Sequence, residues 1–139
     1  MVTPGDIESQ ARTIYQAICV HGMGDETPAS LREWAKALQS GKYKQGYRAL
    51  KRRHGDGPED FYYCCLGVKG ILNSVPFEVH PNVDHVFCVL GDHAILPSSE
   101  LPEFVQGYFT DMNDIYRFSF DDIAQVLLLV ADKCEADEY

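Results

Sequence analysis

Three well-signalled helix starts constrain the fold of this 139-residue chain more than any other feature of its sequence. The first places Thr3 before a proline and an acid, Asp6, which is the arrangement of a capped helix N-terminus. Apolar residues then recur at helical spacing and predict an amphipathic helix over residues 4–20. The other two starts pair a serine with an acid three residues later: Ser30 with Glu33, and Ser119 with Asp122.

The middle of the chain indicates a small sheet. Residues 47–53 and 61–66 flank a turn-rich stretch and predict a hairpin. Shorter patterns indicate a strand at 86–90, an edge strand or loop at 76–81, a helix or strand at 68–72, and a short helix at 101–109. We therefore expect a single domain over residues 1–139 with an α+β fold, built from three main helices and a small antiparallel sheet.

The charge of the chain is unevenly distributed. The net charge is −9, yet residues 1–55 carry nine basic and five acidic side chains, while residues 56–139 carry three and sixteen. No acid occurs between Glu33 and Asp56. We expect one basic patch on an acidic body, which disfavours direct nucleic-acid binding by the whole surface but allows a local anion site.

The cysteine content and the apolar runs bear on the cellular compartment. Five cysteines cannot all pair within one chain, and no export signal or membrane-spanning run is present. Reduced thiols and a cytoplasmic location, with no membrane partner, are the expectation.

The strongest candidate ligand site is the stretch of lysines, arginines and tyrosines between residues 41 and 53. Cations beside aromatic rings suit a phosphate joined to a base, as in a nucleotide, although a solvated basic face is the plainer interpretation. The candidate ligand-binding residues are Lys42, Tyr43, Lys44, Gln45, Tyr47 and Arg48.

Two catalytic or metal-binding interpretations are weaker. The spacing of His80, His85, Cys88 and His93 fits no common zinc pattern, so we expect neither a metal nor another cofactor. A nucleophilic thiol at Cys64 or Cys65, assisted by His54 or His85, would need a surrounding that stabilises a thiolate, whereas the neighbouring residues are apolar. We expect no catalytic residue, and the balance is against an enzyme.

The acidic half offers a different kind of surface. Carboxylates near the last helix could imitate nucleic-acid phosphates and occupy a basic groove on another protein. The candidate partner-binding residues are Asp111, Asp114, Asp121, Asp132 and Glu135. A basic patch and an acidic face on one chain would also suit a homodimer.

Three segments together resemble a group of uncharacterised small phage and prophage proteins. The segments are Trp34-x-x-Ala37-Leu38-x-Ser40-Gly41-x-Tyr43-x-Gln45-Gly46, then Tyr63-Cys64-Cys65-Leu66-Gly67-Val68, then Met112-Asn113-Asp114 with Ser119-Phe120-x-x-Ile123-Ala124. The resemblance implies a phage-borne accessory protein in a bacterial host cell and supplies no reaction. Most of these positions also have a structural interpretation: Trp34 and Leu38 as core anchors, and Asn113 in a turn that bonds local backbone.

Three functions follow as hypotheses. The first is a non-enzymatic phage-type binding protein, a counter-defence inhibitor that presents its acidic face to a host nucleic-acid-handling enzyme. The second is a protein that binds or sequesters a nucleotide or another phosphorylated small molecule at residues 41–53. The third is a thiol- or metal-dependent enzyme.

Overall fold

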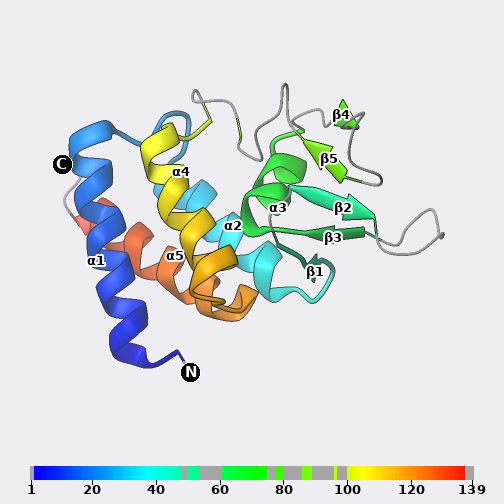
Figure 1. The fold of residues 1–139 in the computed structure, drawn as a ribbon. Helices are drawn as coiled ribbons and strands as arrows, with labels where there is room; N and C mark the ends of the chain where they lie inside the picture. Colours follow the sequence, from blue (N-terminus) through cyan, green and yellow to red (C-terminus); the bar gives the residue numbers. More distant parts are fainter. Residues whose placement is uncertain are drawn as a thin grey trace.

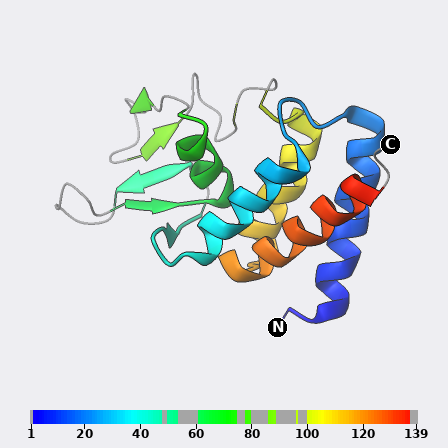
Figure 2. The same ribbon diagram turned by 180° about the vertical axis from the view of Figure 1, so that it is seen from behind.

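Helices form one side of the molecule and a small sheet forms the other, as Figures 1 and 2 show from opposite directions. The computed structural model describes residues 2–47, 50–53, 61–74, 78–79, 86–88, 96 and 100–136. The helices are α1 (Pro4–His21), α2 (Pro28–Gln39), α3 (Cys65–Leu72), α4 (Glu103–Thr110), the π-helical turn η1 (Asp111–Ile115) and α5 (Phe120–Ala136). The strands are β1 (Lys44–Gln45), β2 (Lys51–Arg53), β3 (Phe61–Tyr63), β4 (Glu78–Val79) and β5 (Val86–Cys88).

The first and last of the predicted helix starts are confirmed. At α1 the hydroxyl of Thr3 accepts from the Asp6 amide at 3.1 Å, and the Asp6 carboxylate accepts from the Thr3 amide at 2.9 Å. Ser119 and Asp122 make the same reciprocal pair before α5, with both distances 3.1 Å. Each box satisfies two of the amides that a helix N-terminus leaves without partners.

The predicted start of the second helix is wrong by three residues. The cap is Thr27, whose hydroxyl accepts from the Ser30 amide at 3.1 Å, while the Ser30 hydroxyl accepts from the Thr27 amide at 2.7 Å. Pro28 occupies the first helical position, where its missing amide hydrogen costs nothing. Ser30 is therefore the third-position partner in the box, and Glu33 lies on the exposed side of α2.

The expected antiparallel sheet is instead a mixed sheet with the order β1-β3-β2-β5-β4. The predicted hairpin is present, because Lys51 pairs with Tyr63 and Arg53 with Phe61 in antiparallel register. β1 lies on the other side of β3 and runs parallel to it, with Lys44 opposite Tyr62. β2 runs antiparallel to β3, and therefore also opposite to β1. Because β3 lies between β1 and β2 in the sheet, β1 pairs with the strand that has its own direction.

The α+β class is confirmed, but the expectation of three main helices is wrong. The described residues contain five α-helices and the turn η1. Residues 64–66, expected to continue a strand, instead form the cap and first turn of α3, since short apolar runs fit either structure. α4 continues directly into η1, where the Tyr116 amide donates to the Asp111 carbonyl at 2.8 Å across five residues.

The core lies where α5 packs against α1 and α2, and α3 lies between this helical body and the sheet (Figure 1). Trp34 on α2 is fully buried, its ring centroid lies 4.8 Å from that of Phe109, and its indole N–H donates to the Cys65 carbonyl at 3.0 Å. The expected burial of Leu38 is confirmed as well. Within the described segments, no helix combines the length and apolar character needed to cross a membrane.

Candidate functional site

The segments that carry the phage-protein resemblance meet around one buried side chain, Asn113. Its amide nitrogen donates to the Gly46 carbonyl at 2.9 Å and to the Asp114 carboxylate at 2.7 Å. Its oxygen accepts from the Gln45 side chain at 3.0 Å and from the Cys65 amide at 3.2 Å. The prediction that Asn113 bonds local backbone in a turn is therefore wrong, because η1 directs the side chain inward.

Gln45 extends this network to the start of α5. Its amide nitrogen also donates to the Phe118 carbonyl at 2.8 Å, and its oxygen accepts from the Phe120 amide at 3.0 Å. Both ends of the side chain are thus used inside the protein, although Gln45 was a candidate ligand-binding residue. The structure gives it a role in joining β1 to α5.

The cysteine pair has the surroundings of a structural thiol rather than of a nucleophile. Cys64 and Cys65 are buried at the start of α3. Burial raises the pKa of the Cys64 thiol to about 12 and raises the pKa of Cys65 well above its usual value. Because the reactive form of cysteine is the thiolate, this environment opposes nucleophilic catalysis. The helix N-terminus does not outweigh the loss of solvent.

The metal hypothesis falls mostly on residues outside the described part of the chain. His54, His80, His85 and His93 lie there, and of Cys88 only the backbone is described. Among the described residues, no group of three His, Cys, Asp or Glu side chains could hold a metal ion.

The basic and aromatic side chains of the sheet form one connected series. The Nζ of Lys42 lies 5.6 Å from the Tyr43 ring centroid, and the Tyr43 ring meets the Tyr63 ring edge-on at 5.6 Å. The Nζ of Lys51 lies 5.9 Å from the Tyr63 centroid and 4.1 Å from that of Phe61. We call these five residues, Lys42, Tyr43, Lys51, Phe61 and Tyr63, the basic–aromatic surface.

Local backbone structure explains why Lys42 and Tyr43 reach β3. The Ser40 hydroxyl donates to the Ala37 carbonyl at 2.6 Å and accepts from the Lys42 amide at 3.1 Å, which tightens the turn after α2. Gly41 occupies the left-handed region with φ of 77°. The chain thereby reverses directly into β1, and the Tyr43 ring lies against Tyr63. Burial, with a smaller contribution from Tyr43, raises the pKa of Tyr63 above its ordinary value.

The remaining candidate ligand residues lie elsewhere. Lys44 is opposite Tyr62, with its Nζ 6.0 Å from that ring centroid, and alternation along the strands places this pair on the other face from Tyr63. The Tyr47 ring is covered by the guanidinium of Arg117, whose central carbon lies 4.1 Å from the centroid. Arg48 lies outside the described residues.

Arg117 is a contact that sequence reasoning missed. It follows η1 with φ of 57°, a backbone conformation that side chains other than glycine seldom adopt. Nothing in the spacing of Tyr47 and Arg117, which are far apart in the chain, indicates that they meet. The positive φ belongs to the turn between η1 and α5.

The acidic candidates divide into three places rather than one. Asp121, Asp132 and Glu135 follow one exposed side of α5, which lies beside α2 (Figure 2). Arg32 on α2 binds Asp132 at 2.9 Å and Glu135 at 2.8 Å, and its hydrogen bond lowers the pKa of Glu135. Asp114 belongs to the Asn113 network, and Asp111 lies at the end of α4.

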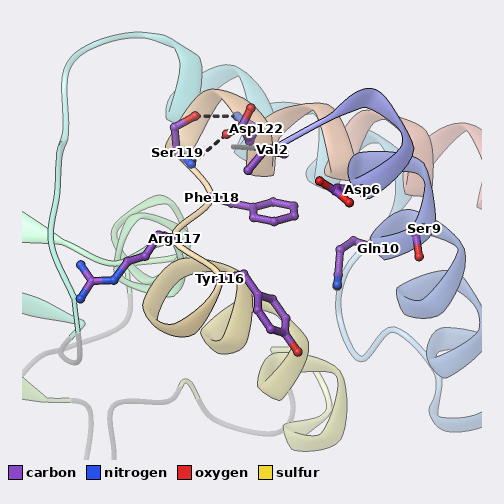
Figure 3. A pocket seen from close by; sticks show the side chains of 9 residues that line it. All are labelled: Val2, Asp6, Ser9, Gln10, Tyr116, Arg117, Phe118, Ser119 and Asp122. Carbon is purple, nitrogen blue, oxygen red and sulfur yellow. Dashed lines mark hydrogen bonds between the residues drawn. The ribbon is translucent and has the colours of Figure 1, made fainter.

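A cavity of about 560 Å³ lies between α1 and the start of α5 (Figure 3). Asp6 and Asp122 line it, but each carboxylate already caps its own helix. The Arg117 side chain extends away from the α1 side of the cavity. With two helix N-termini already neutralised by their own acids, this cavity has little to attract an anion.

Comparison with known proteins found no matching family model, no matching curated protein and no matching solved structure.

Proposed function

We propose that this protein is a non-enzymatic binding protein that takes a nucleotide-like ligand on the basic–aromatic surface. The observation that carries the proposal is the unbroken series from Lys42 through Tyr43 and Tyr63 to Lys51 and Phe61, with neighbouring groups 4.1 to 5.9 Å apart. Aromatic faces stack on a base, and an ammonium group beside such a ring attracts a phosphate.

The electrostatic setting favours a confined site over general anion binding. The whole chain carries a net charge of −9, so an extended polyanion would be repelled by most of the surface. A short ligand with one phosphate group meets only the local lysines. We therefore propose a mononucleotide or a similarly small phosphorylated aromatic compound as the ligand.

Isothermal titration with adenosine and uridine monophosphates, inorganic phosphate and a short single-stranded oligonucleotide tests this proposal. The Lys42→Ala/Lys51→Ala variant should bind the mononucleotides at least about tenfold more weakly than the wild type. The matched control, Arg12→Ala/Lys36→Ala, removes the same charge from exposed positions on α1 and α2 and should bind as the wild type does.

Four results would contradict the proposal. The first is absence of binding by the wild type, and the second is an equal loss in the control variant, which would reveal a response to net charge alone. The third is a large loss from Lys44→Ala, since that lysine belongs to the opposite face of the strands. Equal binding of phosphate alone would remove the role of the aromatic rings.

The counter-defence inhibitor remains a second proposal, supported by the alignment of Asp121, Asp132 and Glu135 along one exposed side of α5. Such a stripe could enter a basic groove of a host nucleic-acid-handling enzyme. Arg32 binds two of the three acids, which reduces the negative charge that the stripe can offer. We therefore rank this proposal second.

Capture from bacterial lysate tests it. Wild-type protein should retain a nucleic-acid-handling enzyme that the Asp121→Lys/Glu135→Lys variant fails to retain. Reversing two acids away from the stripe, in the Glu8→Lys/Asp25→Lys variant, should leave capture intact. Retention of the same enzyme by both variants would eliminate the stripe as the contact.

A further inference from the structure

Several large apolar side chains of the helical body are exposed. Phe104, Ile115 and Tyr116 come from α4, η1 and the residue that follows, and their side chains are 58%, 67% and 52% exposed. The ring of His21, from the end of α1, lies 4.4 Å from that of Phe104, and Val20 beside it is also exposed. An apolar group of this kind on a surface usually marks an interaction site.

A groove follows the exposed side of α4 at Phe104. It has a volume of about 580 Å³ and is lined by Glu103, Phe104, Gly107, Tyr108 and Asp111. The Phe104 and Tyr108 rings meet edge-on at 5.7 Å and form an aromatic wall. Gly107 leaves the floor open, because a Cβ added there would meet no atom within 4 Å.

A carboxylate stands at each end of the aromatic wall. Glu103 and Asp111 are eight residues apart, which is roughly 12 Å along a helix axis. Within the part of the chain that the structure describes, neither carboxylate has an ion-pair or hydrogen-bond partner from another side chain, and no lysine or arginine lines the groove. Carboxylates beside aromatic faces attract an ammonium or guanidinium group, through both ion pairing and contact with the ring.

We propose that the α4 groove is a docking site for a segment of another protein that carries lysine or arginine beside apolar residues. The two carboxylates would receive the cationic side chains, and Phe104 and Tyr108 would cover the apolar ones. The two carboxylates are roughly 12 Å apart along the helix axis, which is more than a small organic cation spans. The same carboxylates repel phosphate, which separates this site from the basic–aromatic surface.

The test is a nuclear magnetic resonance titration of the ¹⁵N-labelled protein with a short amphipathic peptide of leucine and lysine. A peptide with glutamate in place of lysine serves as the matched probe. The lysine peptide should shift the amides of α4 and η1, and the glutamate peptide should not. The Glu103→Gln/Asp111→Asn variant should weaken binding at least about tenfold, and Phe104→Ala should weaken it too.

The Glu8→Gln variant, which removes an exposed acid from α1, should bind the lysine peptide as the wild type does. Phe104 is exposed, so its replacement should leave the melting temperature unchanged and separate lost binding from lost folding. Equal binding of both peptides, shifts centred on α5 instead of α4, or wild-type affinity in the carboxylate variant would each overturn the proposal. A concentration-dependent dimer that Phe104→Ala abolishes would assign the groove to a second copy of this chain and overturn it as well.

Discussion

Asn113 holds together segments that are far apart in the sequence. It links β1 through Gln45 and Gly46, the start of α3 through the Cys65 amide, and η1 through its own position. These three hydrogen bonds involve buried or half-buried groups, where an unmade bond is costly. The chemistry of one amide side chain therefore accounts for several positions of the phage-protein resemblance without a ligand.

The Asn113→Ala variant should lose about 2–4 kcal/mol of unfolding free energy, because the Cys65 amide and the Gly46 carbonyl would be left without partners. Urea denaturation monitored by tryptophan fluorescence measures this directly. Gln125→Ala, which removes an exposed hydrogen bond to Asp121, is the control and should change stability by less than about 0.5 kcal/mol. A loss of similar size in both variants would show that the Asn113 network contributes no more unfolding free energy than one exposed hydrogen bond does.

Gly67 and Gly107 make a matched pair at the same scale. A Cβ at Gly67 would overlap the Leu50 carbonyl oxygen, whereas a Cβ at Gly107 would meet no atom within 4 Å. Gly67→Ala should therefore destabilise the fold by at least about 2 kcal/mol, since backbone must move. Gly107→Ala should stabilise it by about 0.5–1 kcal/mol through helix propensity. Thermal melts of the two variants should shift in opposite directions, and a shift in the same direction would contradict the packing described here.

At the scale of elements, most of the helix caps could be predicted from the sequence, whereas the long-range contacts could not. The boxes of α1 and α5 are complete within four residues, so the sequence was enough to predict them. The box of α2 was misplaced because Ser30 serves as the third-position partner and Thr27 as the cap, and both types of residue suit either position. The contact of Arg117 with Tyr47 depends on how η1 and β1 pack, and no local pattern records that packing.

A buried ion pair fixes the connection between α1 and α2 onto α3. The Nζ of Lys69 lies 2.6 Å from the Glu26 carboxylate, and both side chains are only 2% exposed. The Ser30 hydroxyl donates to the same carboxylate at 3.0 Å, and the Trp34 ring lies 5.7 Å from the ammonium group. Each charge is therefore compensated within the core.

Glu26→Ala should cost about 3–5 kcal/mol, because it leaves the Lys69 ammonium buried without its counter-charge. Replacing both partners, as Glu26→Gln/Lys69→Met, should recover most of that loss. Chemical denaturation of Glu26→Gln, Lys69→Met and the double variant completes a double-mutant cycle that isolates the interaction. If the double variant is as unstable as Glu26→Ala alone, the stability that this contact provides depends on the packing of the two side chains and not on charge compensation.

At the scale of the whole molecule, carboxyl groups with lowered pKa values make the unfolding free energy depend on pH. The backbone amide and hydroxyl of Thr3 lower the pKa of Asp6, and Arg32 lowers the pKa of Glu135. A carboxyl whose folded pKa is lowered contributes stability above its unfolded pKa, and that contribution disappears as the pH falls through the folded value. Unfolding free energy should therefore decrease from about pH 5 towards pH 3.

The Asp6→Asn/Glu135→Gln variant should show a shallower decrease over the same range. Melting temperatures measured at several pH values provide the comparison, with Asp25→Asn as an exposed acid that makes no hydrogen bond or ion pair to the described residues. A wild type and double variant with parallel profiles would mean that other groups control the acid response.

The division into a helical body and a small sheet also separates the surfaces that we propose to bind ligands. The basic–aromatic surface belongs to β2, β3 and the chain leading into β1, while the α4 groove belongs to the helical body (Figure 1). Sequence reasoning found Lys42 and Tyr43 of the first surface through their spacing. Lys51 lay within the predicted segment 41–53 but was not a named candidate, and Phe61 and Tyr63 lay outside it, because only the pairing of β2 with β3 brings these three together.

The most direct test of the central claim is a ¹H–¹⁵N nuclear magnetic resonance titration of the wild-type protein with adenosine monophosphate. Our account predicts concentration-dependent shifts at Lys42, Tyr43, Lys51, Phe61 and Tyr63, weakened by added salt because the lysines are partly exposed. Spectra that stay unchanged at millimolar nucleotide, or shifts centred on α4 or α5 instead of the sheet, would contradict it.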